Sequence, residues 1–190
     1  MRIEEEIKLD YSDVLFRPKR STLKSRKDVD LNRKYTFKHS RSSWKGIPII
    51  ASNMDGVGEI DVAKKLSSHK LMTALTKQHD INQIGTIYKK NIFFDSIALS
   101  CGTSKDSYNR LNSILKKYPK FKFICIDVAN GYSENFSNFV SEVRKKYPKK
   151  TIIAGNVVTA DMTQELVLSG ADIVKVGIGP GSVCTTRIQT

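Results

Sequence analysis

The sequence predicts a parallel α/β fold, and the length of its repeating unit favours a (β/α)8 barrel, the TIM barrel, of which this chain supplies about six β-α units. Three observations lead to this prediction. Short apolar runs recur roughly every 20 to 30 residues. Amphipathic segments with helical spacing lie between them. Each apolar run also ends in a polar or glycine-rich cluster, which is where a barrel of this kind gathers its chemistry.

Six buried parallel strands are expected, because each run is apolar on both faces and a buried parallel strand has no solvent face. The runs are IPIIAS (47–52), LMTAL (71–75), SIALS (96–100), FKFICIDVA (121–129), TIIAGNVV (151–158) and ADIVKVGI (171–178). Helical spacing places Tyr108, Leu111, Leu115 and Tyr118 on one face, and Phe136, Phe139, Val140 and Val143 on another. A third helix is expected to begin near Ala160 and to end at Gly170, since glycine commonly follows a helix.

The domain prediction follows from the number of units. Eight units need on the order of 250 residues, so we expect this chain to be part of a longer polypeptide. Residues 1–45 are basic and lack strong periodicity, and we expect them to form an arm packed on the barrel. Residues 46–190 form the partial barrel, which ends in a cysteine loop. An open doubly wound sheet is the alternative, but no G-x-G-x-x-G follows the first strand.

Composition excludes several classes of protein. With 39% hydrophobic and 27% charged residues, the chain has the balance of a soluble globular protein. The N-terminal MRIEEEIKLD carries acids where a signal peptide needs a basic and then an apolar run. No apolar stretch approaches the roughly 20 residues of a membrane-spanning helix. A cytoplasmic protein without a membrane partner is therefore expected.

The net charge of +13 raises the question of a polyanionic partner. Much of the excess lies in KKYPKFK and RKKYPKK, at the ends of two predicted helices, where cations complement the helix dipole. This placement favours a solvated basic surface, with a polyanion site as the alternative. We expect no nucleic-acid partner, although the charge can attract phosphorylated substrates.

The three cysteines show neither a disulfide framework nor zinc-ligand spacing. Cys125 lies inside an apolar run and is expected to fill the core, whereas Cys101 fits either a core or a functional role. Cys184 follows Gly179-Pro180-Gly181-Ser182, whose glycines expose backbone groups to a ligand or an ion. Near Thr186, its thiol is a candidate nucleophile once deprotonated; a flexible turn with a bystander cysteine is the alternative.

The strand ends form a polar rim. They carry Ser52, Asn53, Met54 and Asp55, then Lys77, then Cys101, Gly102 and Thr103, then Asp127 to Gly131, then Gly155 and Asn156, and last the Cys184 loop.

Five segments of the sequence show a family resemblance. They are DVLFRPKRSTLKSR, IASNMDGVG, DVANGYSENF, GNVVT and SGADIVKVGIGPGSVCTTR. Together they resemble GMP reductase, the relative of IMP dehydrogenase, over essentially the whole chain. The segment DVANGYSE and the short spacing from Lys77 to Ser96, which leaves no room for two CBS motifs, point to the reductase.

The resemblance implies a covalent mechanism. Cys184 would attack C2 of the guanine ring of GMP, ammonia would leave, and a thioimidate would remain. NADPH would then reduce the same carbon, and loss of the thiolate would yield IMP. Thr186, with Lys77 nearby, would move protons to the departing ammonia. A glutamate that completes this relay in the family lies beyond this sequence.

The resemblance also assigns binding residues. Those contacting the cofactor would be Asp127, Val128, Ala129, Ile178 and Gly179, with Ser25 and Arg26 at the adenosine end. An arginine beside a serine suits the 2′-phosphate of NADPH. Potassium would bind backbone oxygens of Gly179, Gly181, Cys184 and Arg187, and substrate would contact Ser182, Ser52 and Met54. The family implies a homotetramer in which N-terminal arms often cross to a neighbouring subunit.

Two departures from the family pattern, Gln78-His79 after the lysine and Gly56 in place of a threonine, remove no reacting group. Two alternatives stay open. One is an oxidoreductase of the IMP dehydrogenase type, which runs in the opposite redox direction with NAD⁺. The other is an inactive truncated form that binds nucleotides or polyanions.

Overall fold

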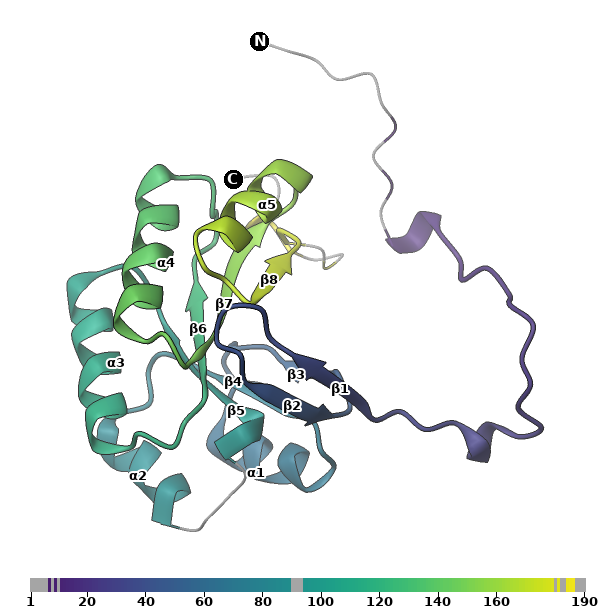
Figure 1. Ribbon diagram of the computed structural model, residues 1–190, viewed down its shortest axis with the longest axis horizontal. Coiled ribbons are helices and arrows are strands. Elements are labelled where there is room, and N and C mark those ends of the chain that lie inside the picture. Colours follow the sequence, from purple (N-terminus) through teal and green to yellow (C-terminus); the bar gives the residue numbers. More distant parts are fainter. Residues whose placement is uncertain are drawn as a thin grey trace.

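The computed structural model describes residues 7, 9, 11–89, 94–179, 181 and 184–186, the side chains of Tyr11 and Lys89 excepted. Its centre is a six-stranded parallel sheet in the order β3-β4-β5-β6-β7-β8, so every strand pairs with its neighbours in sequence (Figure 1). The strands are β3 (Ile50–Ala51), β4 (Met72–Leu75), β5 (Ile97–Cys101), β6 (Phe123–Asp127), β7 (Thr151–Val157) and β8 (Ile173–Val176). A doubly wound sheet would reverse its strand order part-way. The continuous order confirms the expected partial barrel.

The first strand is shorter than the apolar run that predicted it. Pro48 has no N–H to donate, so regular pairing cannot include it. The N–H of Ile47 instead bonds to the carbonyl of Lys70 at 2.9 Å, which joins the run to the end of the first helix. Strand geometry therefore begins only at Ile50.

Among the described residues, five α-helices connect the strands, and Figure 1 shows α2, α3 and α4 side by side on the outer side of the sheet. They are α1 (Ile60–Ser68), α2 (Ile81–Lys89), α3 (Lys105–Lys117), α4 (Glu134–Lys146) and α5 (Ala160–Leu168). Hydroxyl caps start three of them: Ser104, Ser133 and Thr159 accept hydrogen bonds from backbone N–H groups of the first turns. The three helices predicted from spacing are confirmed, and Gly170, with φ of +110°, follows the last one.

The core has two layers because both faces of the sheet are covered. Along β6, Ile124 and Ile126 face the helices, whereas Phe123 and Cys125 face the barrel interior. The interior cluster comprises Phe37, Trp44, Met72, Ala74, Ala98, Phe123, Cys125 and Ile153. Burial on both faces is the physical reason that the four central strands, β4 to β7, read as nearly continuous apolar runs.

A β-hairpin closes the N-terminal end of the barrel. Its strands, β1 (Arg33–Thr36) and β2 (Ser43–Gly46), pair antiparallel. Phe37 from the hairpin packs edge to face on Phe123, with ring centroids 5.7 Å apart. The sequence predicted no strand here, because every residue of β1 is exposed and tertiary contacts, rather than apolar patterning, hold the hairpin.

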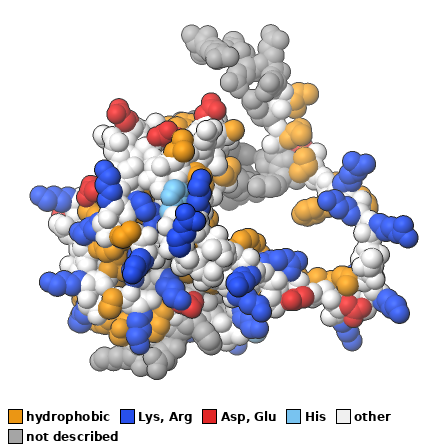
Figure 2. Space-filling model, in the orientation of Figure 1, with side chains coloured by type: hydrophobic (Ala, Val, Ile, Leu, Met, Phe, Trp, Pro, Cys, Tyr) orange, Lys and Arg blue, Asp and Glu red, His pale blue; other side chains and the backbone are white. Residues whose placement is uncertain are grey.

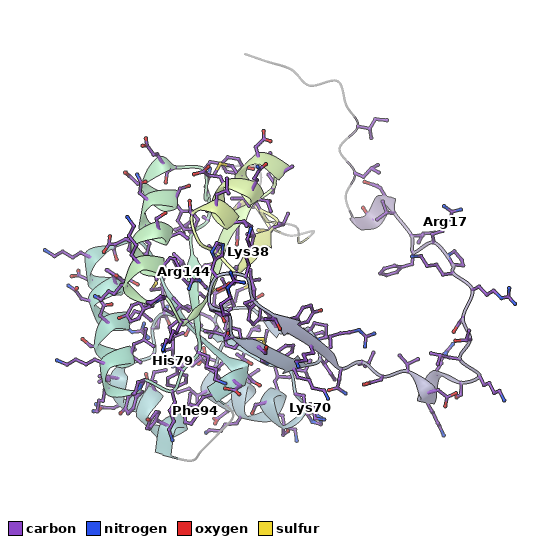
Figure 3. All side chains as sticks on the ribbon, viewed as in Figure 1. Arg17, Lys38, Lys70, His79, Phe94 and Arg144 are labelled. Carbon is purple, nitrogen blue, oxygen red and sulfur yellow. The ribbon has the colours of Figure 1, made fainter. Side chains whose placement is uncertain are left out.

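Residues 12–31 precede the hairpin and have exposed side chains, including the apolar Leu15 and Phe16. Figures 1 and 3 show this segment running outside the barrel, with Arg17 labelled away from the body. The expected packing of residues 1–45 on the barrel as an arm stays a prediction. None of the helices in the described ranges has the length and hydropathy needed to cross a membrane.

Candidate active site

The connections that follow the parallel strands lie at one edge of the sheet, which brings the predicted rim residues to the same end of the barrel. Ser52 and Met54 follow β3 with exposed side chains, and Lys77 is exposed in the connection after β4. Asp127 ends β6, with Val128 and Ala129 directly after it. These positions give a substrate access to the side chains from solvent.

An ion pair crosses the interior below this rim. The ammonium of Lys175, on β8, donates hydrogen bonds to the carboxylate of Asp127 and, at 3.2 Å, to the side-chain oxygen of Asn53. The three residues belong to the first, fourth and sixth strands of the sheet or their connections, so the contact requires the sheet to curl. Sequence reasoning missed Lys175. Its signal was a single charged residue inside an apolar run, a position that requires a partner.

Asn156 contributes an acceptor beside the same strands. Its backbone N–H bonds to the carbonyl of Val128 at 2.9 Å, and its carbonyl accepts from Gly131 at 2.8 Å, which fastens the connection after β6 to β7. Its side-chain oxygen is buried and has no hydrogen-bond partner among the described residues. A buried acceptor without a donor is costly, so this atom suits a ligand that carries an N–H group.

The loop after β8 places the two principal catalytic candidates together. Gly177 and Gly179 have φ of +137° and +54°, which is why glycine is needed at both turns. The N–H of Cys184 bonds to the carbonyl of Gly181 at 3.0 Å, and the Cys184 thiol lies 3.4 Å from the Thr186 hydroxyl. Thiol and hydroxyl are therefore within proton-transfer reach. Ser182 and Arg187, which were predicted to bind substrate and potassium, lie outside the described residues.

The connection that carries Lys77 is held from two sides. The backbone carbonyl of His79 accepts hydrogen bonds from the Arg110 guanidinium, from Nε at 2.9 Å and also from Nη2. The His79 ring is buried, with Nε2 3.2 Å from the Gly58 carbonyl and 3.3 Å from a carboxylate oxygen of Glu59. His79 belongs to the Gln78-His79 pair, which departs from the family pattern, and these contacts give it a structural role.

Ser25 and Arg26 are not brought to this rim within the chain. Ser25 caps the short 3-10 helix η2 (Arg26–Asp28), and its hydroxyl accepts from the N–H of Lys27 at 3.2 Å. That helix lies on the segment that runs outside the barrel (Figure 1). Their predicted cofactor contact stays a prediction.

The comparisons with known proteins decide the family. Residues 8–190 match the sequence profile of the IMP dehydrogenase / GMP reductase domain. The chain belongs to the IMP dehydrogenase / GMP reductase family. Proteins named GMP reductase are similar along the whole chain: 54% identical in Yersinia enterocolitica and in Escherichia coli O1:K1, and 52% in Aeromonas hydrophila. This member of the family spans about half their length, since the match covers 55% of each.

A solved structure of the same family supports the fold. The crystal structure of inosine 5′-monophosphate dehydrogenase from Legionella pneumophila superposes with a TM-score of 0.76 at 28% identity. The superposition covers 96% of this chain and 54% of that one. The barrel prediction and the family resemblance are both confirmed.

The chemistry of the three thiols in this family member differs because their burial differs. Burial raises the pKa of Cys101 to about 12 and that of Cys125 to about 11, whereas Cys184 is partly exposed. At pH 8 we expect a thiol-specific reagent to label Cys184 in the native protein and all three cysteines after denaturation. Peptide mass spectrometry identifies the labelled sites. Fast native labelling of Cys101 would contradict the described packing.

Proposed function

We propose that the protein containing this chain is an NADPH-dependent GMP reductase, which converts GMP to IMP and ammonia in purine salvage. The observation that carries the proposal is the partly exposed Cys184 thiol beside Thr186, at the C-terminal rim of a barrel. The 54% identity to proteins named GMP reductase favours the reductase over the dehydrogenase alternative.

Cys184 acts as the nucleophile. Its thiolate forms a bond with C2 of guanine, an electron-poor carbon between two nitrogens, and the C2–N bond to the amino group breaks. Thr186 and Lys77 pass a proton to the departing ammonia, and a thioimidate remains on Cys184. Once C2 is reduced, the C–S bond breaks and the thiolate is restored. One cysteine therefore serves both the deamination and the reduction.

NADPH, when bound, supplies the hydride for this reduction. The residues present fit such a cofactor, because the buried Asn156 oxygen is an acceptor without a donor on β7, the strand paired with the one that Asp127 ends, and a carboxamide N–H can satisfy it. The proposed contacts are Asp127, Val128, Ala129, Ile178 and Gly179, with Ser25 and Arg26 supplied by a neighbouring subunit. The role of the Lys175 ammonium is to hold the Asp127 carboxylate in place.

Substrate and ion contacts are proposed for the same rim. Ser182 would bind the GMP phosphate, with Ser52 and Met54 beside the nucleotide. Potassium would bind the backbone oxygens of Gly179, Gly181, Cys184 and Arg187. The Gly181 carbonyl already accepts one hydrogen bond, and a carbonyl oxygen has a second lone pair for a cation. We further propose a cytoplasmic homotetramer.

A direct assay tests the function. Loss of NADPH absorbance that depends on GMP, together with release of IMP and ammonia, is the expected result. Reduction of NAD⁺ with IMP, and no oxidation of NADPH with GMP, would instead support the dehydrogenase alternative. Binding of GMP without turnover in either direction would support the inactive form.

A further inference from the structure

We propose that the N-terminal face of the barrel carries a second binding site, which takes the phosphate chain of a polyphosphate ligand. The site is a cavity of about 400 Å³ lined by Phe94, Asp95, Lys120, Lys122, Lys149 and Lys150. Its side chains come from the segments that lead into β5, β6 and β7. The candidate active site lies at the opposite ends of these strands, so the two sites are separate.

The cavity is formed entirely by central units of the sheet. The outer strands are β3 and β8, whereas the segments that line the cavity lead into β5, β6 and β7. Further β-α units of a barrel would join β3 and β8, away from the cavity. Figure 3 places Phe94 on the side of α2, within the described body.

A repeated turn brings the lysines together. The sequence KKYPK occurs at 116–120, across the end of α3, and again at 145–149, across the end of α4. Both helices end at the tyrosine with nearly the same backbone: Tyr118 has φ and ψ of −127° and 72°, and Tyr147 has −123° and 63°. Because β6 and β7 are neighbours, the equivalent turns deliver Lys120 and Lys149 to one cavity. The helix dipole accounts for lysines within the two helices but not for these, which follow the helix ends.

The charge at the cavity is unbalanced. Lys122 pairs with Asp95 at 2.8 Å, and this is the ion pair recorded at the cavity within the described part of the chain. The Lys150 ammonium donates to the carbonyls of Pro119 and Phe121, both at 2.5 Å, and so is fixed without a carboxylate. Burial lowers the pKa of Lys150, which means that its charged form gains from an added anion. Figure 2 shows many Lys and Arg side chains and few acidic ones over the barrel body in this view.

The distribution of the lysine side chains around the cavity favours a chain of phosphate groups over a single phosphate group. Besides Lys122, which pairs with Asp95, three lysines from the ends of the two turns line the space: Lys120, Lys149 and Lys150. A linear polyphosphate places charge at successive positions along such a space. Lys120 also lies over aromatic rings, with its ammonium 5.6 Å from the Tyr88 centroid and 5.8 Å from that of Phe94. Phe94 gives the cavity an apolar wall, which a nucleoside triphosphate can use and inorganic tripolyphosphate cannot.

Calorimetric titration of the purified protein with inorganic tripolyphosphate, in the presence of saturating GMP, tests the site. We expect binding that the double variant Lys120→Gln/Lys149→Gln weakens by at least about 10-fold. The matched control is Lys116→Gln/Lys145→Gln, which removes the same charge from the first lysines of the two repeats, both exposed on helices. We expect less than about a 2-fold change in the control.

Absence of binding, or equal weakening in the two double variants, would overturn the proposal, because diffuse charge would then explain the affinity. Binding of tripolyphosphate that is seen without GMP but lost at saturating GMP would also overturn it, since the anion would then occupy the substrate site. If tripolyphosphate binds as expected, a comparison with ATP identifies the kind of ligand. Tighter binding of ATP that Phe94→Ala removes would identify a nucleotide ligand, and equal affinity for ATP and tripolyphosphate would identify the phosphate chain alone. Failure to bind GMP counts against the proposed function but not against this site.

Discussion

Replacing Cys184 with alanine is expected to lower GMP-dependent oxidation of NADPH by a factor on the order of 10⁴ or more, while GMP still binds. The reason is that the substitution removes the atom that forms the covalent bond and leaves the rest of the rim in place. Thr186, whose hydroxyl lies 3.4 Å from the thiol, cannot replace it because an alcohol is far less ionised at neutral pH. Steady-state kinetics gives the rate, and calorimetry with GMP gives the affinity.

Cys101→Ala is the matched control, because Cys101 is fully buried against the helices and its raised pKa keeps the thiol protonated. We expect this variant to retain activity, with a modest loss of stability from the lost packing. A Cys184→Ala protein that keeps a substantial share of the wild-type rate would contradict covalent catalysis. Equal loss in both variants would indicate a general effect on folding.

Replacing Asp172 with alanine is expected to lower the free energy of unfolding by about 3–5 kcal/mol. Its fully buried carboxylate pairs with the Arg144 guanidinium at 2.6 Å. It also accepts backbone hydrogen bonds from His39 at 2.8 Å, Ser40 at 3.2 Å and Ile152 at 3.2 Å. The substitution would leave these donors and a largely buried cation without their acceptor. It would also release the β1–β2 hairpin from β7 and the segment before β8.

Urea unfolding followed by circular dichroism measures this loss. The control is Asp95→Asn, which breaks the exposed ion pair with Lys122 and should cost less than about 1 kcal/mol because solvent screens that pair. Asp172→Asn should fall between the two, since an amide keeps one oxygen as an acceptor. An Asp172→Ala protein as stable as Asp95→Asn would mean that the carboxylate does not hold the hairpin.

The fold was predicted from the pattern of apolar residues along the chain. Five of the six strands lie within the predicted runs, and β5 extends one residue beyond its run, to Cys101, because strands buried on both faces are mostly apolar. The helices around Leu111 and Val140 followed from their spacing, and polar clusters after the strands marked the rim. The β1–β2 hairpin has no such pattern, since its stability comes from Phe37, Trp44 and the distant Asp172.

Local periodicity and short motifs were enough to predict the strands, their parallel arrangement, the rim at their C-terminal ends and Cys184 as the nucleophile candidate. The tertiary structure was needed to show that Cys101 is buried and that Lys175 pairs with Asp127 across the interior. It also decided that two KKYPK turns meet at one cavity. The physical reason is that burial and pairing of charges depend on contacts between residues far apart in the chain, which the curl of the sheet brings together.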